Sequence, residues 1–107
     1  MRAFEFADIE AAHAAARRLY HEFLREPSLS VGLYVLPPGG ADPQSPHDQD
    51  EVYYVLRGRG QISVAGETQA VGPGSVVFVA NGVEHRFSDI TEELALLVFF
   101  APAEAEG

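Results

Sequence analysis

The sequence predicts an all-β domain, a sandwich or a small barrel, with one helix at its N-terminal end. Two observations favour this fold class. From Pro27 onward, short apolar segments are separated by turn residues about every 6 to 12 positions, a spacing typical of sandwiches and barrels. Many of these segments are apolar on both faces, which fits a small barrel whose outer surface is covered by the helix or by a second subunit.

The N-terminal part predicts an amphipathic helix after a short arm. Residues 1–7 alternate apolar and polar, as an arm or a short edge strand would. From Asp8, a suitable N-cap, apolar residues recur at three- and four-residue steps until Pro27 stops the helix near Glu26. His13 and His21 lie two turns apart on this helix, too far for joint chelation, so we expect both at a solvated or interface edge.

The rest of the chain predicts short strands. Residues 29–36 alternate so that Leu29, Val31, Leu33 and Val35 share one face. Residues 52–56 predict a second strand, and residues 57–60 (RGRG) predict a hairpin turn that leads into a strand at 61–65. Further strands are expected at 75–79, 83–88 and 94–100, and the tail 101–107 should fray.

Length and composition limit the function. A chain of 107 residues fits one domain, with the arm and helix at 1–27 and the barrel at 28–107. The net charge of −9 argues against binding to nucleic acid or to an anionic membrane surface. The sequence has no cysteine, which excludes zinc–thiolate sites, iron–sulfur clusters and thiol nucleophiles. Neither a signal peptide nor an apolar stretch of 18 residues is visible, so we expect a cytoplasmic protein.

One group of residues predicts a metal site. If the strand reaches back to His47, alternation places His47, Gln49 and Glu51 on one face. His85 is the only other histidine in the β region, and it follows a turn. A set of imidazole and carboxylate ligands suits Fe, Mn, Ni, Co or Zn better than Ca or Mg. Each residue alone is more typical of an ordinary surface or strand-edge position.

Two segments carry a resemblance to a known family. Residues 39–58 follow the pattern Gly, five residues, His-x-His, three residues, Glu, six residues, Gly, with Ser45 in place of the first histidine. Residues 74–89 follow Gly, five residues, Pro-x-Gly, two residues, His, three residues, Asn, with Ala80 for the proline and Asp89 for the asparagine. Residues 29–100 therefore resemble a small single-domain protein of the cupin superfamily.

The resemblance implies a double-stranded β-helix, or jelly-roll barrel, with a metal near one end of its interior. It assigns the metal ligands to His47, Glu51 and His85. Serine is a poor ligand for a divalent transition metal, so Ser45 leaves the site with two histidines and one carboxylate, a set that resembles the facial triad of non-haem iron oxygenases. An amide from Gln49 or Gln44 is a possible fourth ligand. Alternatively, the lost histidine marks a cupin that no longer binds metal.

Other residues are expected to line the pocket. Tyr53 shares the face of Glu51 and could contact substrate or donate a proton, although core packing is the more ordinary role. Phe87, two residues after His85, and Ser45 are also expected at the pocket. Asp42, Asp48 and Asp50 form an acidic rim that tunes the charge of the site or only faces water.

Three functions remain open. The first is a small metal-dependent enzyme of dioxygenase type, with isomerase or lyase chemistry less favoured. The second is a module that binds a small ligand without chemistry, and the third is an accessory subunit with a filled interior. The sequence names no substrate. Because both sheet faces and the helix are apolar, a homodimer is expected.

Overall fold

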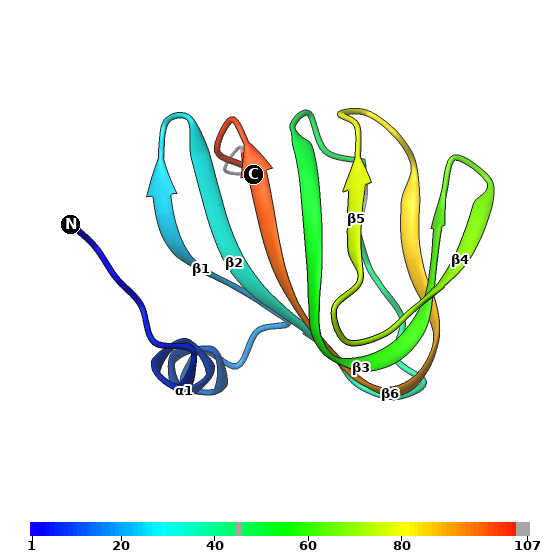
Figure 1. Ribbon diagram of the computed structural model, residues 1–107, viewed down its shortest axis with the longest axis horizontal. Coiled ribbons are helices and arrows are strands. Elements are labelled where there is room, and N and C mark those ends of the chain that lie inside the picture. Colours follow the sequence, from blue (N-terminus) through cyan, green and yellow to red (C-terminus); the bar gives the residue numbers. More distant parts are fainter. Residues whose placement is uncertain (45, 105–107) are drawn as a thin grey trace.

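The computed structural model describes residues 1–44 and 46–104 and contains one helix and six strands. The elements are α1 (Phe6–Ala16), β1 (Tyr20–Glu26), β2 (Leu29–Leu36), β3 (Asp50–Val64), β4 (Glu67–Val71), β5 (Val76–Val79) and β6 (His85–Ala101). All strand pairs are antiparallel, in the order β1-β2-β6-β3-β4, with β5 paired to β3 (Figure 1). The all-β prediction is confirmed.

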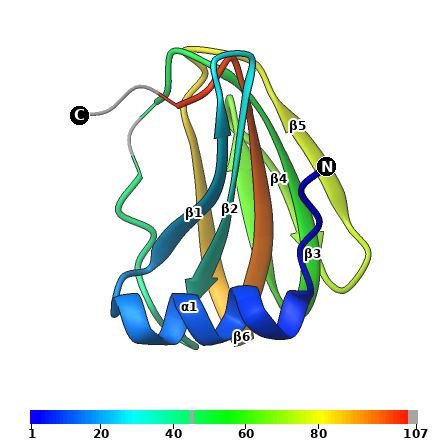
Figure 2. The same cartoon turned by 90° about the vertical axis from the view of Figure 1, so that its left-hand side faces the viewer.

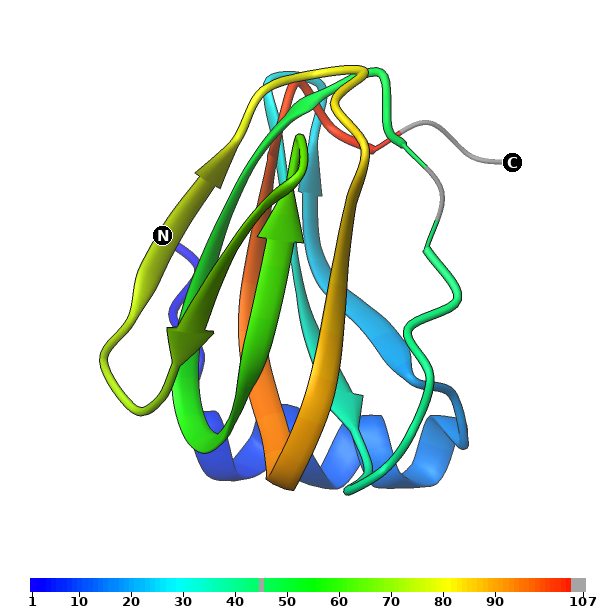
Figure 3. The same cartoon turned by 90° about the vertical axis from the view of Figure 1, so that its right-hand side faces the viewer.

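The barrel arises because β3 and β6 pair with each other along both of their halves and bend in the middle. Their register shifts around Arg57 and Arg59, which marks β-bulges. Gly58 lies at this bend with a φ of +94°, and a Cβ there would stand 2.0 Å from the backbone oxygen of Glu93. Only glycine fits such a position. Figures 1 and 3 show the two arms of the bent sheet facing each other across the interior.

The interior between the arms is the main core. Its buried residues come from strands β2 to β6: Tyr34, Leu36, Tyr53, Val55, Ile62, Val71, Val79, Phe87, Ile90, Leu94, Leu96, Val98 and Phe100. Helix α1 instead covers the outer face of the sheet, where Ile9 packs on Leu33 and Ala95 (Figure 2). The alternation predicted for residues 29–36 is confirmed, since Leu33 faces the helix while Tyr34 and Leu36 face the barrel interior.

The predicted helix over residues 8–26 is wrong in its second half. Helix α1 begins at Phe6, with Glu5 rather than Asp8 at the N-cap, and ends at Ala16, where Arg17 takes a left-handed conformation with φ 53°. Residues 20–26 form β1, which pairs with β2. The backbone hydrogen bonds to β2 and the packing of Tyr20 on Tyr34 outweigh the helical spacing of the side chains. The division into an N-terminal segment, 1–27, and a barrel, 28–107, stays a prediction. Strand β1 lies within the N-terminal segment and is nevertheless part of the sheet.

One predicted turn is absent, and two of the predicted strands are parts of one strand. Residues 57–60 do not turn, because β3 runs through them as one strand that bends at its bulges. The strands predicted at 83–88 and 94–100 fall in the single strand β6, which begins at His85 and whose bend includes Asp89 at φ 47°. In both cases a strand that bends at bulges has the same sequence signals as two strands joined by a turn. Within the described residues, no helix is long and apolar enough to cross a membrane.

Candidate metal centre

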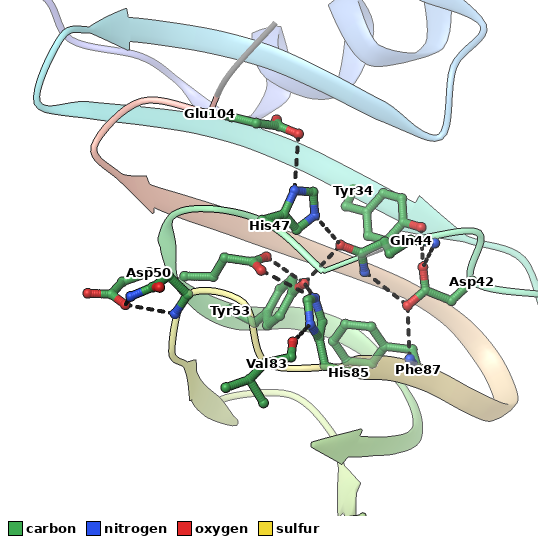
Figure 4. A network of polar contacts seen from close by, with 12 residues as sticks. Tyr34, Asp42, Gln44, His47, Asp50, Tyr53, Val83, His85, Phe87 and Glu104 are labelled. Atoms are coloured by element: carbon green, nitrogen blue, oxygen red, sulfur yellow. Dashed lines mark hydrogen bonds and ion pairs between the residues drawn. The ribbon is translucent and has the colours of Figure 1, made fainter. Parts of the chain in front are cut away.

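Two hydrogen-bonded segments meet at one end of the barrel. The backbone N–H of Gly82 donates to the carbonyl oxygen of His47 at 2.6 Å. The backbone N–H of Asn81 donates to the Asp50 carboxylate at 2.9 Å. These contacts hold the turn before β6 against the segment that leads into β3 (Figure 4). The turn and the loop therefore position their histidines relative to each other.

His47, Glu51 and His85 come together at this end. One potential ligand atom from each residue lies within 4.8 Å of the other two. Glu51 and His85 are buried, and His47 is partly buried. Glu51 lies near the start of β3, and His85 is the first residue of β6. The structure thus brings together the three residues that the sequence singled out.

The contacts of His85 fix which of its ring nitrogens can bind. Nδ1 lies 2.9 Å from the carbonyl oxygen of Val83. A carbonyl oxygen only accepts, so Nδ1 carries the hydrogen and donates it. In the neutral ring Nε2 then has a free lone pair, and it faces the interior, 3.2 Å from Glu51 Oε2. A backbone partner of this kind is the usual support for a metal-binding histidine.

His47 has a similar arrangement. Its Nδ1 faces the Glu104 carboxylate, with 3.6 Å between Nδ1 and Oε1. Its Nε2 faces the interior, 3.3 Å from Gln44 Oε1. Burial raises the pKa of Glu104. A carboxylate behind the outer nitrogen orients an imidazole and raises its basicity toward a metal on the other side.

The Tyr53 hydroxyl lies among these groups. It lies 2.7 Å from Glu51 Oε1, 3.0 Å from Gln44 Oε1 and 3.0 Å from His85 Nε2 (Figure 4). Its ring is fully buried and packs edge-on against Phe87. Burial and the Glu51 charge raise the pKa of Tyr53, so the phenol is neutral at physiological pH. Tyr53 therefore belongs to the core through its ring and to the site through its hydroxyl.

The cluster has more acceptors than donors. Tyr53 carries one hydroxyl hydrogen, and three acceptors surround it: the Glu51 carboxylate, the Gln44 carbonyl oxygen and His85 Nε2. Burial raises the pKa of Glu51, against the opposing effects of the Tyr53 hydrogen bond and the two imidazoles, because a charged carboxylate here is poorly solvated. A cation, or an added proton, would relieve this surplus of lone pairs. The donor set fits a divalent transition metal.

The orientation of Gln44 is set by Asp42. The Gln44 amide nitrogen donates to Asp42 Oδ2 at 2.9 Å, which leaves its carbonyl oxygen facing His47 and Tyr53. Asp42 is buried and also accepts hydrogen bonds from the Tyr34 hydroxyl at 2.5 Å and the Phe87 backbone N–H at 2.9 Å. The prediction placed Asp42 on an acidic rim and left the direction of Gln44 open, because a proline-rich loop has no periodicity from which burial can be read.

The other predicted site residues lie around the cluster. Ser45 lies outside the described residues. Gln49 is buried, but it makes none of the hydrogen bonds recorded among the described residues of the site. Phe87 lies in the core behind Tyr53. Of the two amides considered as a fourth ligand, Gln44 is therefore the one whose oxygen contacts His47 and the Tyr53 hydroxyl.

Two cavities open beside the cluster. One, of about 280 Å³, is bordered by Gln44 and His85 and by polar groups of β3 and β6. The other, of about 220 Å³, is bordered by Gln44 and His47 and is walled mainly by apolar and aromatic side chains. A small molecule could therefore approach the cluster from either side.

Relatives of the chain share its sequence pattern and its fold. Residues 32–101 match the family described as "Cupin domain". An uncharacterized protein of Streptomyces coelicolor is 50% identical over 105 residues, which cover 98% of this chain and all of that protein. A Bacillus halodurans crystal structure has a TM-score of 0.79 at 19% identity, covering 98% of this chain and 85% of that one. A Thermus thermophilus structure has a TM-score of 0.75 at 24% identity, covering 96% and 99%. The family match and the shared barrel show that this chain belongs to the cupin family.

Proposed function

We propose that the protein binds one divalent transition metal ion, of the group Fe, Mn, Ni, Co or Zn. The ligands are His47 Nε2, His85 Nε2 and a Glu51 carboxylate oxygen, with Gln44 Oε1 as the fourth. One observation carries the proposal: three hydrogen-bond acceptors, on Glu51, Gln44 and His85, surround the single hydrogen of the Tyr53 hydroxyl, and His47 lies beside them. Gln44 would replace the ligand that Ser45 does not supply.

We further propose an enzyme of dioxygenase type that acts on a small organic acid or aromatic molecule, with isomerase or lyase chemistry less favoured. A metal in this site would supply Lewis acidity or, as iron, redox chemistry at its open positions. Glu104 and the Val83 carbonyl hold the two imidazoles in place. The neutral Tyr53 phenol is a hydrogen-bond donor to a group bound beside Glu51. Oxygen uptake by the Fe²⁺-loaded protein, with catechols and small organic acids in turn, tests this chemistry.

Metal content tests the binding proposal. The protein is stripped with chelator, reloaded with each of the five metals, and analysed for metal per chain beside the His47→Ala/Glu51→Ala double variant. His21→Ala serves as the control, because His21 lies on β1 outside the cluster. We expect about one metal ion per chain in the native protein and in the control, and little in the double variant. Equal metal content in all three would show that the cluster is not the site.

A metal-free binding module is the second candidate, and one observation favours it. The Tyr53 hydroxyl already bonds to the groups that would hold the metal, and a proton shared between Glu51 and His85 would satisfy the remaining acceptors. This candidate predicts no metal above the level of the double variant, together with a ligand-induced rise in melting temperature without turnover. An accessory subunit with a filled interior predicts neither.

A homodimer and a cytoplasmic location remain proposals. The outer face of β3 and β5 supports the first, since Tyr54, Val76 and Phe78 are exposed there on adjacent strands. Sedimentation velocity at micromolar concentration should give a dimer mass, and a monomer would contradict it.

A further inference from the structure

We propose that Tyr53 makes Glu51 bind the metal through one carboxylate oxygen, Oε2, and so keeps a second position on the ion open. Tyr53 is then a positioning residue, because it acts through Glu51 and does not bind the metal itself. This role rests on the metal site proposed above, and it adds which Glu51 oxygen binds and why the other does not.

The two oxygens of the Glu51 carboxylate have different neighbours. Oε1 lies 2.7 Å from the Tyr53 hydroxyl oxygen, whereas Oε2 lies 3.2 Å from His85 Nε2. The side chains of Glu51 and His85 are 1% and 0% exposed, so protein groups surround both. The carboxylate is thus held with one oxygen toward a hydrogen-bond donor and the other toward a ligand nitrogen of the cluster.

The hydrogen of the Tyr53 hydroxyl is best placed on Glu51 Oε1. Three acceptors surround the hydroxyl: Glu51 Oε1 at 2.7 Å, Gln44 Oε1 at 3.0 Å and His85 Nε2 at 3.0 Å (Figure 4). The Glu51 oxygen is the nearest, and a hydrogen bond to a carboxylate is shorter and stronger than one to a neutral acceptor. A bound metal would take the Nε2 lone pair of His85 and draw on the Gln44 oxygen, which leaves Oε1 as the strongest acceptor.

No hydrogen lies between Glu51 Oε2 and His85 Nε2 when the imidazole is neutral. Nδ1 of His85 carries the hydrogen and donates it to the Val83 carbonyl at 2.9 Å, so Nε2 presents a lone pair. Two lone pairs that face each other at 3.2 Å resemble two neighbouring ligands of one ion. Such ligands lie about 3.0 Å apart when each bond is about 2.1 Å and the angle between them is about 90°. Oε2 is therefore the oxygen that faces the ion.

Packing holds the Tyr53 hydroxyl in place. The ring is fully buried and packs edge-on against Phe87, with 5.0 Å between the ring centroids. At Glu51 and Tyr53, strand β3 is paired with β5 on one side and β6 on the other. Oε1 could bind the ion only by leaving a hydroxyl that does not follow it. A six-coordinate ion with four protein ligands keeps two open positions, and a second Glu51 oxygen would leave only one.

Infrared spectroscopy tests this role on the full-length protein loaded with Co²⁺. The two stretching bands of a carboxylate lie far apart when one oxygen binds a metal and closer together when both bind. We expect the wide separation in the difference spectrum between the metal-loaded and metal-free native protein. Tyr53→Phe keeps the ring, removes the hydroxyl and should narrow the separation. Tyr20→Phe is the matched control and should keep the native pattern, because the Tyr20 hydroxyl is also buried but has no hydrogen-bond partner among the described residues.

Two small metal ligands probe the open positions of the Co²⁺-loaded proteins, with binding followed by visible absorption. Azide binds through one atom and needs one open position, whereas acetohydroxamate binds through two oxygens and needs two adjacent positions. We expect azide to bind the native protein, Tyr20→Phe and Tyr53→Phe alike. Acetohydroxamate should bind Tyr53→Phe about tenfold more weakly than the other two, which is the size of effect found for residues that orient metal ligands.

A narrow band separation in the native protein, or equal acetohydroxamate affinities for the native protein and Tyr53→Phe, would overturn the role of Tyr53. The native spectrum alone tests one-oxygen binding, whether or not the variant folds. A visible charge-transfer band in the Fe³⁺-loaded protein that is lost in Tyr53→Phe would also overturn it, since Tyr53 would then bind the metal itself. Failure of the native protein to take up Co²⁺ would instead overturn the metal site, and this role with it.

Discussion

Asp42→Asn should lower both the stability of the barrel and the metal affinity of the site. The Asp42 carboxylate accepts hydrogen bonds from Tyr34, Phe87 and twice from Gln44. An asparagine keeps one acceptor oxygen. In its best orientation that oxygen still accepts from the Gln44 side-chain amide and the Phe87 backbone N–H. The new amide nitrogen then faces the Tyr34 hydroxyl, which can rotate and accept a hydrogen bond from it. It also faces the Gln44 backbone N–H, which can only donate and so is left without an acceptor.

The magnitude follows from these contacts. One backbone N–H loses its acceptor, and two further hydrogen bonds lose their charge assistance, so the variant should lose about 2–4 kcal/mol of unfolding free energy. That is less than the stability of a typical domain, so the protein stays folded. The weaker hold on the Gln44 amide should lower metal affinity about 10-fold, as for other residues that orient metal ligands.

Urea unfolding followed by circular dichroism measures the first effect, and chelator competition for Co²⁺ or Zn²⁺ measures the second. Asp48→Asn is the matched control: it makes the same chemical change in the same loop, at an exposed side chain, and should change stability by less than about 0.5 kcal/mol. Equal unfolding free energies for the two variants would refute the structural role of Asp42. A loss of stability with unchanged metal affinity would refute Gln44 as a ligand.

Three further outcomes are expected. Gly58→Ala should lower the free energy of unfolding in urea by about 3–5 kcal/mol, because an alanine there would have a left-handed φ and its Cβ would clash with a backbone oxygen. Gly66→Ala, at a position with open space around it, should lose only the part due to the left-handed φ. Equal losses in the two variants would contradict this. Glu51→Gln should stabilise the metal-free protein at pH 8 but not at pH 4. Burial raises the Glu51 pKa, so above about pH 4.3 the folded state binds more protons than the unfolded state, and stability falls as the pH rises through the folded-state pKa. A stability difference between variant and native protein that does not change with pH would count against this prediction. Burial also raises the pKa of three tyrosines, Tyr20, Tyr34 and Tyr53. In the Tyr54→Phe variant these are the only tyrosines, so absorbance at 295 nm should show them ionising in one cooperative step with alkaline unfolding. Gradual ionisation of that variant while it is still folded would disagree.

Local patterns were enough to predict much of the β structure after Pro27 and the grouping of His47, Glu51 and His85. The alternation in residues 29–36 reports a strand with two different environments, and the structure places α1 on one face and the barrel interior on the other. The cluster was predictable because the spacing between His47 and Glu51, together with the turn before His85, specifies a strand start and a returning strand. These features depend on residues close in sequence.

The features that the sequence did not predict depend on contacts between distant residues. Tyr20 and Leu24 have helical spacing, yet pairing with β2 makes this segment a strand. Arg57 to Gly60 has the composition of a turn, yet β6 continues beside it and the segment becomes a bend. The burial of Asp42 depends on donors from β2 and β6 that reach a loop without periodicity.

The most direct test of the central proposal is a crystal structure of the metal-loaded protein with anomalous data collected at the absorption edge of the metal. We expect one anomalous peak within bonding distance of Nε2 of His47, Nε2 of His85 and a carboxylate oxygen of Glu51, with the Gln44 carbonyl oxygen as the fourth protein ligand. Absence of a peak at the cluster, or a peak bound through Nδ1 of either histidine, would contradict it.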